Sequence, residues 1–178
     1  MKKITDIINL EQKLIDAETE YNYQGALTYH LDNHTQDFTD RTILEIVLWK
    51  VNRYPDLNPD IINEINSLRK SYNEAAAKSL IRKILDLKGF DLPMASTVMR
   101  FALPKRFQII DQRVYRIITP KEDLLKMPHN KDKKVEFYFD YLKRLKEICQ
   151  QKGIVFSKAD RVLYTLDKKE NGDVAIRY

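Results

Sequence analysis

Cysteine, glycine and proline are all scarce in this chain, and each scarcity narrows the class of protein. The only cysteine, Cys149, excludes an internal disulfide, a four-cysteine iron–sulfur cluster and a thiolate zinc site. Four glycines and six prolines are too few for a turn-rich β-sandwich, so the composition favours helices. No apolar run approaches the roughly 20 residues that span a bilayer, and the first residues lack the features of a signal peptide. We therefore expect an intracellular, cytoplasmic protein without a membrane partner.

The length of the chain fits one domain with its own hydrophobic core. Its 178 residues are 43% hydrophobic and 32% charged, which is an ordinary composition for a soluble protein. A core of this size needs neither disulfides nor a structural metal. Helical spacing of apolar residues recurs along most of the sequence. We expect a single all-α domain over residues 1–178, with seven or eight helices and a frayed tail at about 168–178.

The net charge of +5 is distributed unevenly along the sequence. Residues 1–87 carry 11 basic and 14 acidic side chains, whereas residues 88–116 carry six basic and two acidic ones. Residues 117–178 mix 14 basic with 10 acidic side chains, which is typical of solvated helix faces. The excess of basic side chains in residues 88–116 indicates a surface that can attract phosphates. Its basic residues are Lys88, Arg100, Lys105, Arg106, Arg113 and Arg116.

A glycine turn between two predicted helices lies at residues 87–93. The first helix follows Ser71–Glu74, which has the spacing of a capping box, and it ends at Gly89, a residue suited to a left-handed backbone. Pro93 fits the first turn of the second helix, so the hairpin spans about 72–103. Backbone N–H groups at such a turn can bind a phosphate without reading sequence. The alternative is a plain corner between helices, in which Gly89 only ends the first one.

An aspartate follows a short apolar segment downstream of this hairpin. Residues 107–110 read as extended, and Asp111 can cap the helix of residues 114–118. Arg113 and Arg116 lie beside it, where they can hold phosphates or keep the carboxylate ionised. Two interpretations of Asp111 remain open: a functional carboxylate that faces a cleft, or a helix cap paired with Arg113.

The spacing Leu87-x-Gly89-hydrophobic-x-x-x-x-Ala95 resembles the helix-hairpin-helix of DNA repair glycosylases, and Asp111, 22 positions after Gly89, matches their catalytic aspartate. The likeness is to the adenine-glycosylase branch and to 8-oxoguanine-glycosylase-like proteins. It implies a helix-hairpin-helix DNA-glycosylase-like fold, duplex DNA as the partner, no cofactor, and Asp111 as the group that stabilises the cationic sugar. Pro93 stands where bifunctional members hold a Schiff-base lysine, so the resemblance implies a monofunctional enzyme.

The same resemblance indicates which residues bind DNA. Asp91 departs from the pattern, because the commoner hairpin has a glycine there, and its charge lies near the proposed phosphate. A fainter likeness covers Asp160–Tyr164, where we expect a structural role. The predicted DNA-binding residues are Lys88, Gly89, Phe90, Asp91, Leu92, Arg106, Arg113 and Arg116.

The first half of the chain contributes weaker candidates. Glu45 matches a glutamate on an early helix of the superfamily, so it is either a second acid that protonates a departing base or a solvent-facing residue. Trp49 stands where many glycosylases carry a wedging glutamine, and with Tyr23 and Tyr29 it can line a base pocket or pack between helices. We read residues 21–34 as an irregular connection, and we expect no metal site there despite its two histidines.

Three functions are compatible with these observations. The first is a DNA glycosylase-like hydrolase of base excision repair that acts on an extruded damaged or mismatched base. The second is a non-catalytic helix-hairpin-helix protein that binds nucleic acid. The third is a structural or partner-binding helical protein whose basic segment is an ordinary solvated face. A position of Asp111 in a cleft beside the hairpin would favour the first function over the second, and a fully buried cap would favour the second.

Overall fold

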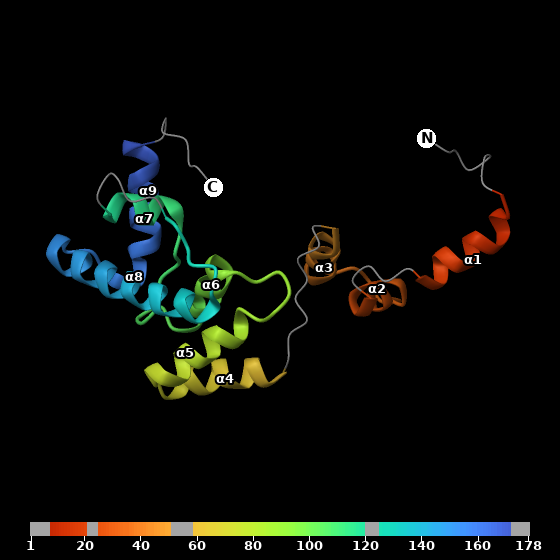
Figure 1. Ribbon diagram of the computed structural model, residues 1–178, viewed down its shortest axis with the longest axis horizontal. Coiled ribbons are helices and arrows are strands. Elements are labelled where there is room, and N and C mark those ends of the chain that lie inside the picture. The colour runs from red at the N-terminus through yellow and green to blue at the C-terminus, as the bar shows by residue number, and fades with distance from the viewer. Residues whose placement is uncertain (1–7, 21–24, 51–58, 120–124, 172–178) are drawn as a thin grey trace. The chain divides into compact units, whose positions relative to one another are not determined.

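A computed structural model of the chain describes residues 8–20, 25–50, 59–119 and 125–171 (Figure 1). Over these ranges the protein is all-α, with nine α-helices, one short 3₁₀ turn and no strand, which confirms the predicted fold class. No helix in these ranges combines the length and apolar character needed to cross a membrane. The chain divides into two compact units, unit 1 (Met1–Tyr54) and unit 2 (Pro55–Tyr178). One domain over residues 1–178 stays a prediction.

Unit 1 contains three helices, and one of them corrects the sequence analysis. They are α1 (Leu10–Glu20), α2 (Gly25–Asp32) and α3 (Asp40–Lys50), with α2 packed against α3. The irregular connection predicted for residues 21–34 is wrong over α2. Leu27 is buried and anchors that helix, and Gly25 stands at its first position, where glycine weakens a helix little. The hydroxyl of Thr39 accepts a hydrogen bond from the amide of Thr42 at 3.3 Å and caps α3.

Unit 2 builds its core around α5. The buried residues Ala77, Leu80, Ile81 and Ile84 form one face of α5, which packs on α4, α6 and α8, while α7 packs on α9 (Figure 1). The tail predicted from about residue 168 instead continues α9 to Glu170, and residues 172–178 lie outside the described ranges. The elements of this unit are α4 (Pro59–Lys70), α5 (Glu74–Ile84), α6 (Leu92–Ala102), α7 (Gln112–Ile118), α8 (Lys131–Lys152), η2 (Phe156–Lys158) and α9 (Ala159–Glu170).

The hairpin between α5 and α6 forms as predicted, but its first cap differs. Asn73, and not Ser71, caps α5: its side-chain oxygen accepts a hydrogen bond from the amide of Ala76 at 2.8 Å. Serine and asparagine cap helices about equally well, so the residue types alone did not decide the start of the helix.

The prediction that the first helix ends at Gly89 is wrong, because α5 ends at Ile84 with Leu85 as a right-handed C-cap. Gly89 has the predicted left-handed backbone, with a φ of +81°, but it lies in the turn that follows, and Pro93 lies in the first turn of α6.

The segment 107–110 connects α6 to α7 and is held from α8. The hydroxyl groups of Tyr138 and Tyr141 donate hydrogen bonds to the carbonyl oxygens of Gln108 and Ile109, each at 2.8 Å. Both tyrosines are buried, so these bonds satisfy backbone groups that lack free access to water. The position of the segment, and of the aspartate that follows it, therefore depends on α8.

Two polar side chains complete the fixation of this segment. The amide group of Gln108 donates to the carbonyl oxygen of Pro104 at 2.8 Å, and its oxygen accepts from the amide of Asp160 at 3.3 Å. The hydroxyl of Ser96 accepts from the amide of Ile110 at 3.2 Å. Because Gln108 and Ser96 are both fully buried, α6 and the start of α9 are joined to the segment inside the core.

Candidate functional site

The turn between α5 and α6 leaves two backbone amides open. Within the described residues, the amides of Lys88 and Gly89 donate no hydrogen bond. Both residues are exposed, and a Cβ added at Gly89 would meet no atom within 4 Å. The Lys88 side chain forms no ion pair with any described carboxylate. The turn thus presents two amide donors and one cation to solvent, a combination suited to an anion.

Asp91 occupies the N-terminus of α6. Its carboxylate accepts a hydrogen bond from the amide of Leu92 at 2.7 Å and forms an ion pair with Lys134. Partial burial by itself raises the pKa of Asp91, but the hydrogen bonds from Lys134 and from the Leu92 amide outweigh it and hold the pKa below its ordinary value. The charged carboxylate therefore competes with an incoming anion at this helix end, and Lys134 compensates its charge.

Two predicted DNA-binding side chains of the hairpin face the core. Leu92 is fully buried, and Phe90 packs half-buried against the same hydrophobic cluster. Their apolar side chains hold the turn on the core, because burying them removes apolar surface from water. A ligand at this turn meets Lys88 and the backbone of Gly89 rather than these two side chains.

Asp111 both caps α7 and lines a cleft. Its Oδ1 accepts a hydrogen bond from the amide of Arg113 at 2.7 Å, which confirms the predicted cap. The side chain remains partly exposed at a cleft of about 410 Å³. No described residue of the hairpin 87–93 lines this cleft, so the carboxylate faces a cavity that the turn does not border. The other lining residues are Ile109, Val114, Asp160, Arg161, Tyr164 and Thr165.

Arg113 and Arg116 bind a buried aspartate of α9. The guanidinium of Arg116 donates to both carboxylate oxygens of Asp167, at 2.6 and 2.7 Å, and that of Arg113 donates at 3.1 Å. Burial by itself raises the pKa of Asp167, but the hydrogen bonds from Arg116, Asn171 and Arg113 lower it below its ordinary value. The two arginines thus fasten α7 to α9, and the predicted pairing of Arg113 with the Asp111 carboxylate is replaced by an amide hydrogen bond.

A second buried ion pair lies next to the cleft. Arg100 of α6 and Asp160 of α9 approach to 3.0 Å, between Nε and Oδ2, with each side chain only 6% exposed. Arg100 therefore adds nothing to the exposed basic surface that the charge distribution predicted. Asp160 has the structural role expected of it, because it forms this buried ion pair. The similar role of Asp167 was not predicted from the sequence. Asp160 and Asp167 lie with Leu163 on the buried face of α9. Their helical spacing could have indicated buried ion pairs, because a carboxylate at a core position requires a partner.

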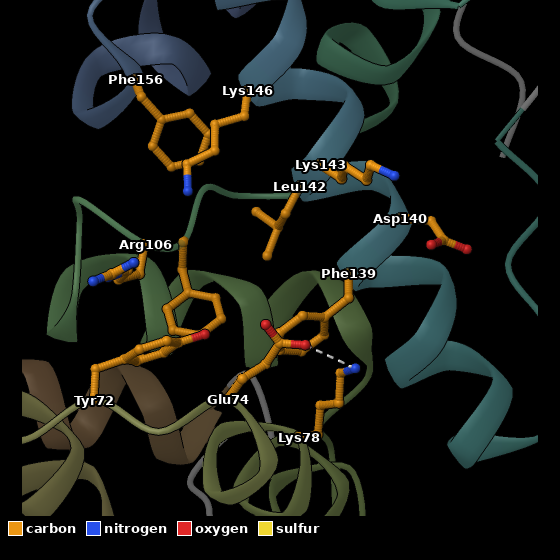
Figure 2. A pocket seen from close by; sticks show the side chains of 11 residues that line it. Tyr72, Glu74, Lys78, Arg106, Phe139, Asp140, Leu142, Lys143, Lys146 and Phe156 are labelled. Atoms are coloured by element: carbon orange, nitrogen blue, oxygen red, sulfur yellow. Dashed lines mark ion pairs between the residues drawn. The ribbon is translucent and has the colours of Figure 1, made fainter.

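Arg106 belongs to a different part of unit 2. Its guanidinium lies over the ring of Tyr72, 4.7 Å from the ring centroid. It lines a pocket formed by the start of α5, the middle of the α6–α7 connection, α8 and η2 (Figure 2). This pocket shares no lining residue with the Asp111 cleft. The structure thus separates Arg106 from the other predicted DNA-binding residues.

The candidates in unit 1 are engaged within that unit. The carboxylate of Glu45 lies 3.1 Å from Nε of Arg41 and 3.3 Å from Nε2 of His30, and its side chain is only 13% exposed, so the solvent-facing interpretation is wrong. The indole of Trp49 donates a hydrogen bond to the hydroxyl of Thr28 at 2.8 Å. Tyr29 of α2 is 74% exposed. Tyr23 lies outside the described residues.

The described residues define an all-α protein in which an open glycine turn precedes a carboxylate at a cleft. No protein-family model, curated protein sequence or solved structure matches the chain. Across the described ranges, no group of three or more His, Cys, Asp or Glu side chains is arranged to hold a metal ion. The donors available to a ligand are backbone amides and basic side chains, and the acceptor of interest is Asp111.

Proposed function

We propose that this chain is a DNA-binding protein of the base-excision-repair type, which contacts the duplex backbone at the α5–α6 turn and hydrolyses an N-glycosidic bond with Asp111. One observation carries the proposal. The aspartate that lies 22 positions after Gly89 keeps its side chain at a cleft of about 410 Å³ although it also caps α7. Asn73 and Asn130, which cap α5 and α8, are exposed but line neither this cleft nor the pocket of Arg106, so the cleft distinguishes Asp111 from these caps.

The geometry of the Asp111 carboxylate suits this chemistry. Oδ1 is held by the amide of Arg113, whereas Oδ2 accepts no hydrogen bond from any described residue. A fixed carboxylate with one open oxygen can stabilise positive charge on a deoxyribose and orient a water molecule. As the C1′–N bond breaks, its electron pair leaves with the base, the water oxygen bonds to C1′, and a water proton finally resides on the departing base.

The α5–α6 turn supplies the sequence-independent part of the interaction. The open amides of Lys88 and Gly89 can donate to phosphate oxygens, and the Lys88 ammonium adds a charge. Binding of this kind displaces condensed counterions, so its affinity falls as the salt concentration rises. A duplex affinity that does not change with salt would contradict this part of the proposal.

The test of catalysis is abasic-site formation on a panel of damaged and mismatched duplexes. Asp111→Asn keeps a residue that caps helices about as well as aspartate, so α7 is retained while the charge is removed. We expect a rate lower by about 10²-fold or more, the usual effect of removing one electrostatic group from a reacting centre. The matched control is Asp132→Asn, an exposed aspartate of α8, with the wild-type rate expected. Equal rates for Asp111→Asn and wild type would overturn the role of Asp111.

A second candidate function is non-catalytic DNA binding through the same turn. The observation that favours it is the bond from the Arg113 amide to Asp111, because this bond alone explains an aspartate at that position. Salt-dependent duplex binding without abasic-site formation on any substrate would select this alternative. Absence of duplex binding would leave the structural or partner-binding role.

A further inference from the structure

Unit 2 contains a second pocket, of about 360 Å³, on the side of α8 that carries Phe139. We call it the aromatic–basic pocket. Figure 2 shows its lining side chains, which come from Tyr72 and α5, from the connection after α6, from α8 and from η2. The buried side chains of Phe107 and Leu142 form its floor. The size lies within the range of small-molecule sites.

Three aromatic rings in this pocket each have a basic side chain over one face, an arrangement that keeps cations next to apolar surface. The pairs, with the distance from the cation to the ring centroid, are Arg106 with Tyr72 (4.7 Å), Lys78 with Phe139 (4.8 Å) and Lys146 with Phe156 (5.6 Å). Both kinds of group are therefore present along the same cavity: flat faces on which an aromatic ligand can stack, and charges for an anion.

The lining has a positive net charge, with four basic side chains and two acidic ones, Glu74 and Asp140. Asp140 forms no ion pair with a described residue, and in Figure 2 it lies on the side of Lys143, away from Arg106 and Lys146. The carboxylate of Glu74 forms an ion pair with the ammonium of Lys78, at 3.0 Å. Among the described residues, neither Arg106 nor Lys146 forms an ion pair with a carboxylate. In Figure 2 the ammonium of Lys146 extends from α8 toward the side on which Arg106 lies, whereas that of Lys143 points away. Two cations thus remain available to one anionic group.

We propose that the aromatic–basic pocket binds a nucleotide, with the base stacked on a pocket ring and the phosphate held by Arg106 and Lys146. Arginine matches phosphate oxygens with two parallel N–H donors, and lysine adds a point charge. Aromatic side chains stack on every base, so the pocket recognises the class of ligand rather than one base. The ligand is a free nucleoside monophosphate or the phosphorylated end of a single strand, which share this chemistry. The inference is independent of Asp111.

Calorimetric titration with AMP, adenosine and inorganic phosphate tests the two halves of the site. We expect AMP to bind at least about tenfold more tightly than either part, because only AMP uses both the rings and the cations. Phosphate that binds as tightly as AMP would overturn the role of the rings, and adenosine that binds as tightly would overturn the role of the cations. Titration of a single-stranded tetranucleotide with and without a 5′-phosphate separates the sources. A phosphorylated strand that binds more tightly than AMP identifies a strand end, and the reverse order identifies a free nucleotide.

Variants locate the binding to this pocket. Lys146→Gln is expected to weaken AMP about five- to tenfold, because one charge on the phosphate is lost, and Phe156→Leu is expected to weaken it by a similar factor. Lys152→Gln, a change of the same type on an exposed residue of α8 outside the pocket, is the matched control. Asp111→Asn must leave AMP affinity unchanged. Unaltered affinity in Lys146→Gln and Phe156→Leu, or no binding of AMP and of the phosphorylated tetranucleotide at millimolar concentration, would overturn the proposal.

Discussion

The hydroxyl of Tyr141 donates a hydrogen bond to the carbonyl oxygen of Ile109, 2.8 Å away and two residues before Asp111. Tyr138, one turn earlier on α8, bonds to Gln108 in the same way. Burial raises the pKa of both tyrosines well above the ordinary value, so both hydroxyls stay protonated and keep donating. The backbone that leads to Asp111 is therefore fixed by a helix that follows it in sequence.

Replacing Tyr141 with Phe should destabilise unit 2 by about 1 to 2 kcal/mol, because the Ile109 carbonyl loses its partner beside a buried ring. The measurement is the free energy of unfolding in urea. Tyr164→Phe, at an exposed position of α9, should change it by less than about 0.5 kcal/mol. A Tyr141→Phe protein as stable as the wild type would show that this bond does not contribute.

The buried Asp167 should make the free energy of unfolding depend on pH in the acidic range. Because its pKa in the folded state is lowered, its contribution is present above the ordinary carboxyl pKa of about 3.9 and is lost as the pH falls through the folded-state value. Asp167→Asn leaves Arg113 and Arg116 without their charge partner and should cost on the order of 2 to 4 kcal/mol at neutral pH.

The difference in unfolding free energy between Asp167→Asn and wild type should shrink as the pH is lowered below about 4, because the wild-type carboxyl then also becomes neutral. Unfolding free energies measured from pH 7 to pH 3 check the trend. Asp132→Asn, whose carboxylate is exposed, provides the comparison. A stability difference that stays constant over this range would contradict the assigned linkage.

Asp91→Asn should strengthen duplex DNA binding if the α5–α6 turn contacts phosphate. Asparagine retains the cap of α6, while one negative charge disappears and Lys134 loses its ion-pair partner. A like charge close to a phosphate costs roughly 1 kcal/mol in a water-like medium, so affinity should rise about three- to tenfold. Fluorescence anisotropy with a labelled duplex measures the change. Affinity that is unchanged or lower would place the DNA elsewhere on the protein.

Lys88→Gln should weaken duplex binding and reduce the slope of log affinity against log salt by about one, since one phosphate contact is lost. Titrations at several salt concentrations give the slope. Lys152→Gln removes the same charge from the far end of α8 and should leave the slope as it is in the wild type. Equal slopes for both variants would argue against a phosphate at the turn.

Features determined by neighbouring residues were predictable from the sequence. The left-handed Gly89, Pro93 in the first turn of α6 and the cap by Asp111 each depend on a backbone conformation that one residue type favours locally. The start of α5 was missed because Ser71 and Asn73 are equally good caps two positions apart. Local signals thus located the hairpin and the carboxylate.

The partners of the arginines were not predictable in the same way. Arg116 and Arg113 reach Asp167 across 51 and 54 positions of sequence, and the pairing exists only because α7 packs on α9. Likewise, the pocket cation Arg106 was grouped with the hairpin by its position in the sequence, whereas the fold places it over Tyr72. Charge patterning indicates that cations are present, but packing decides which surface they reach.

Trp49 is the only tryptophan of the sequence, and its indole is hydrogen-bonded inside unit 1. Selectively excited tryptophan emission is therefore a label-free signal from that unit, whereas most of the helical circular dichroism comes from the longer unit 2. Following both signals through one denaturant titration measures whether the two units unfold together. Coincident transitions would mean one cooperative folding unit, and separate ones would assign each unit its own stability.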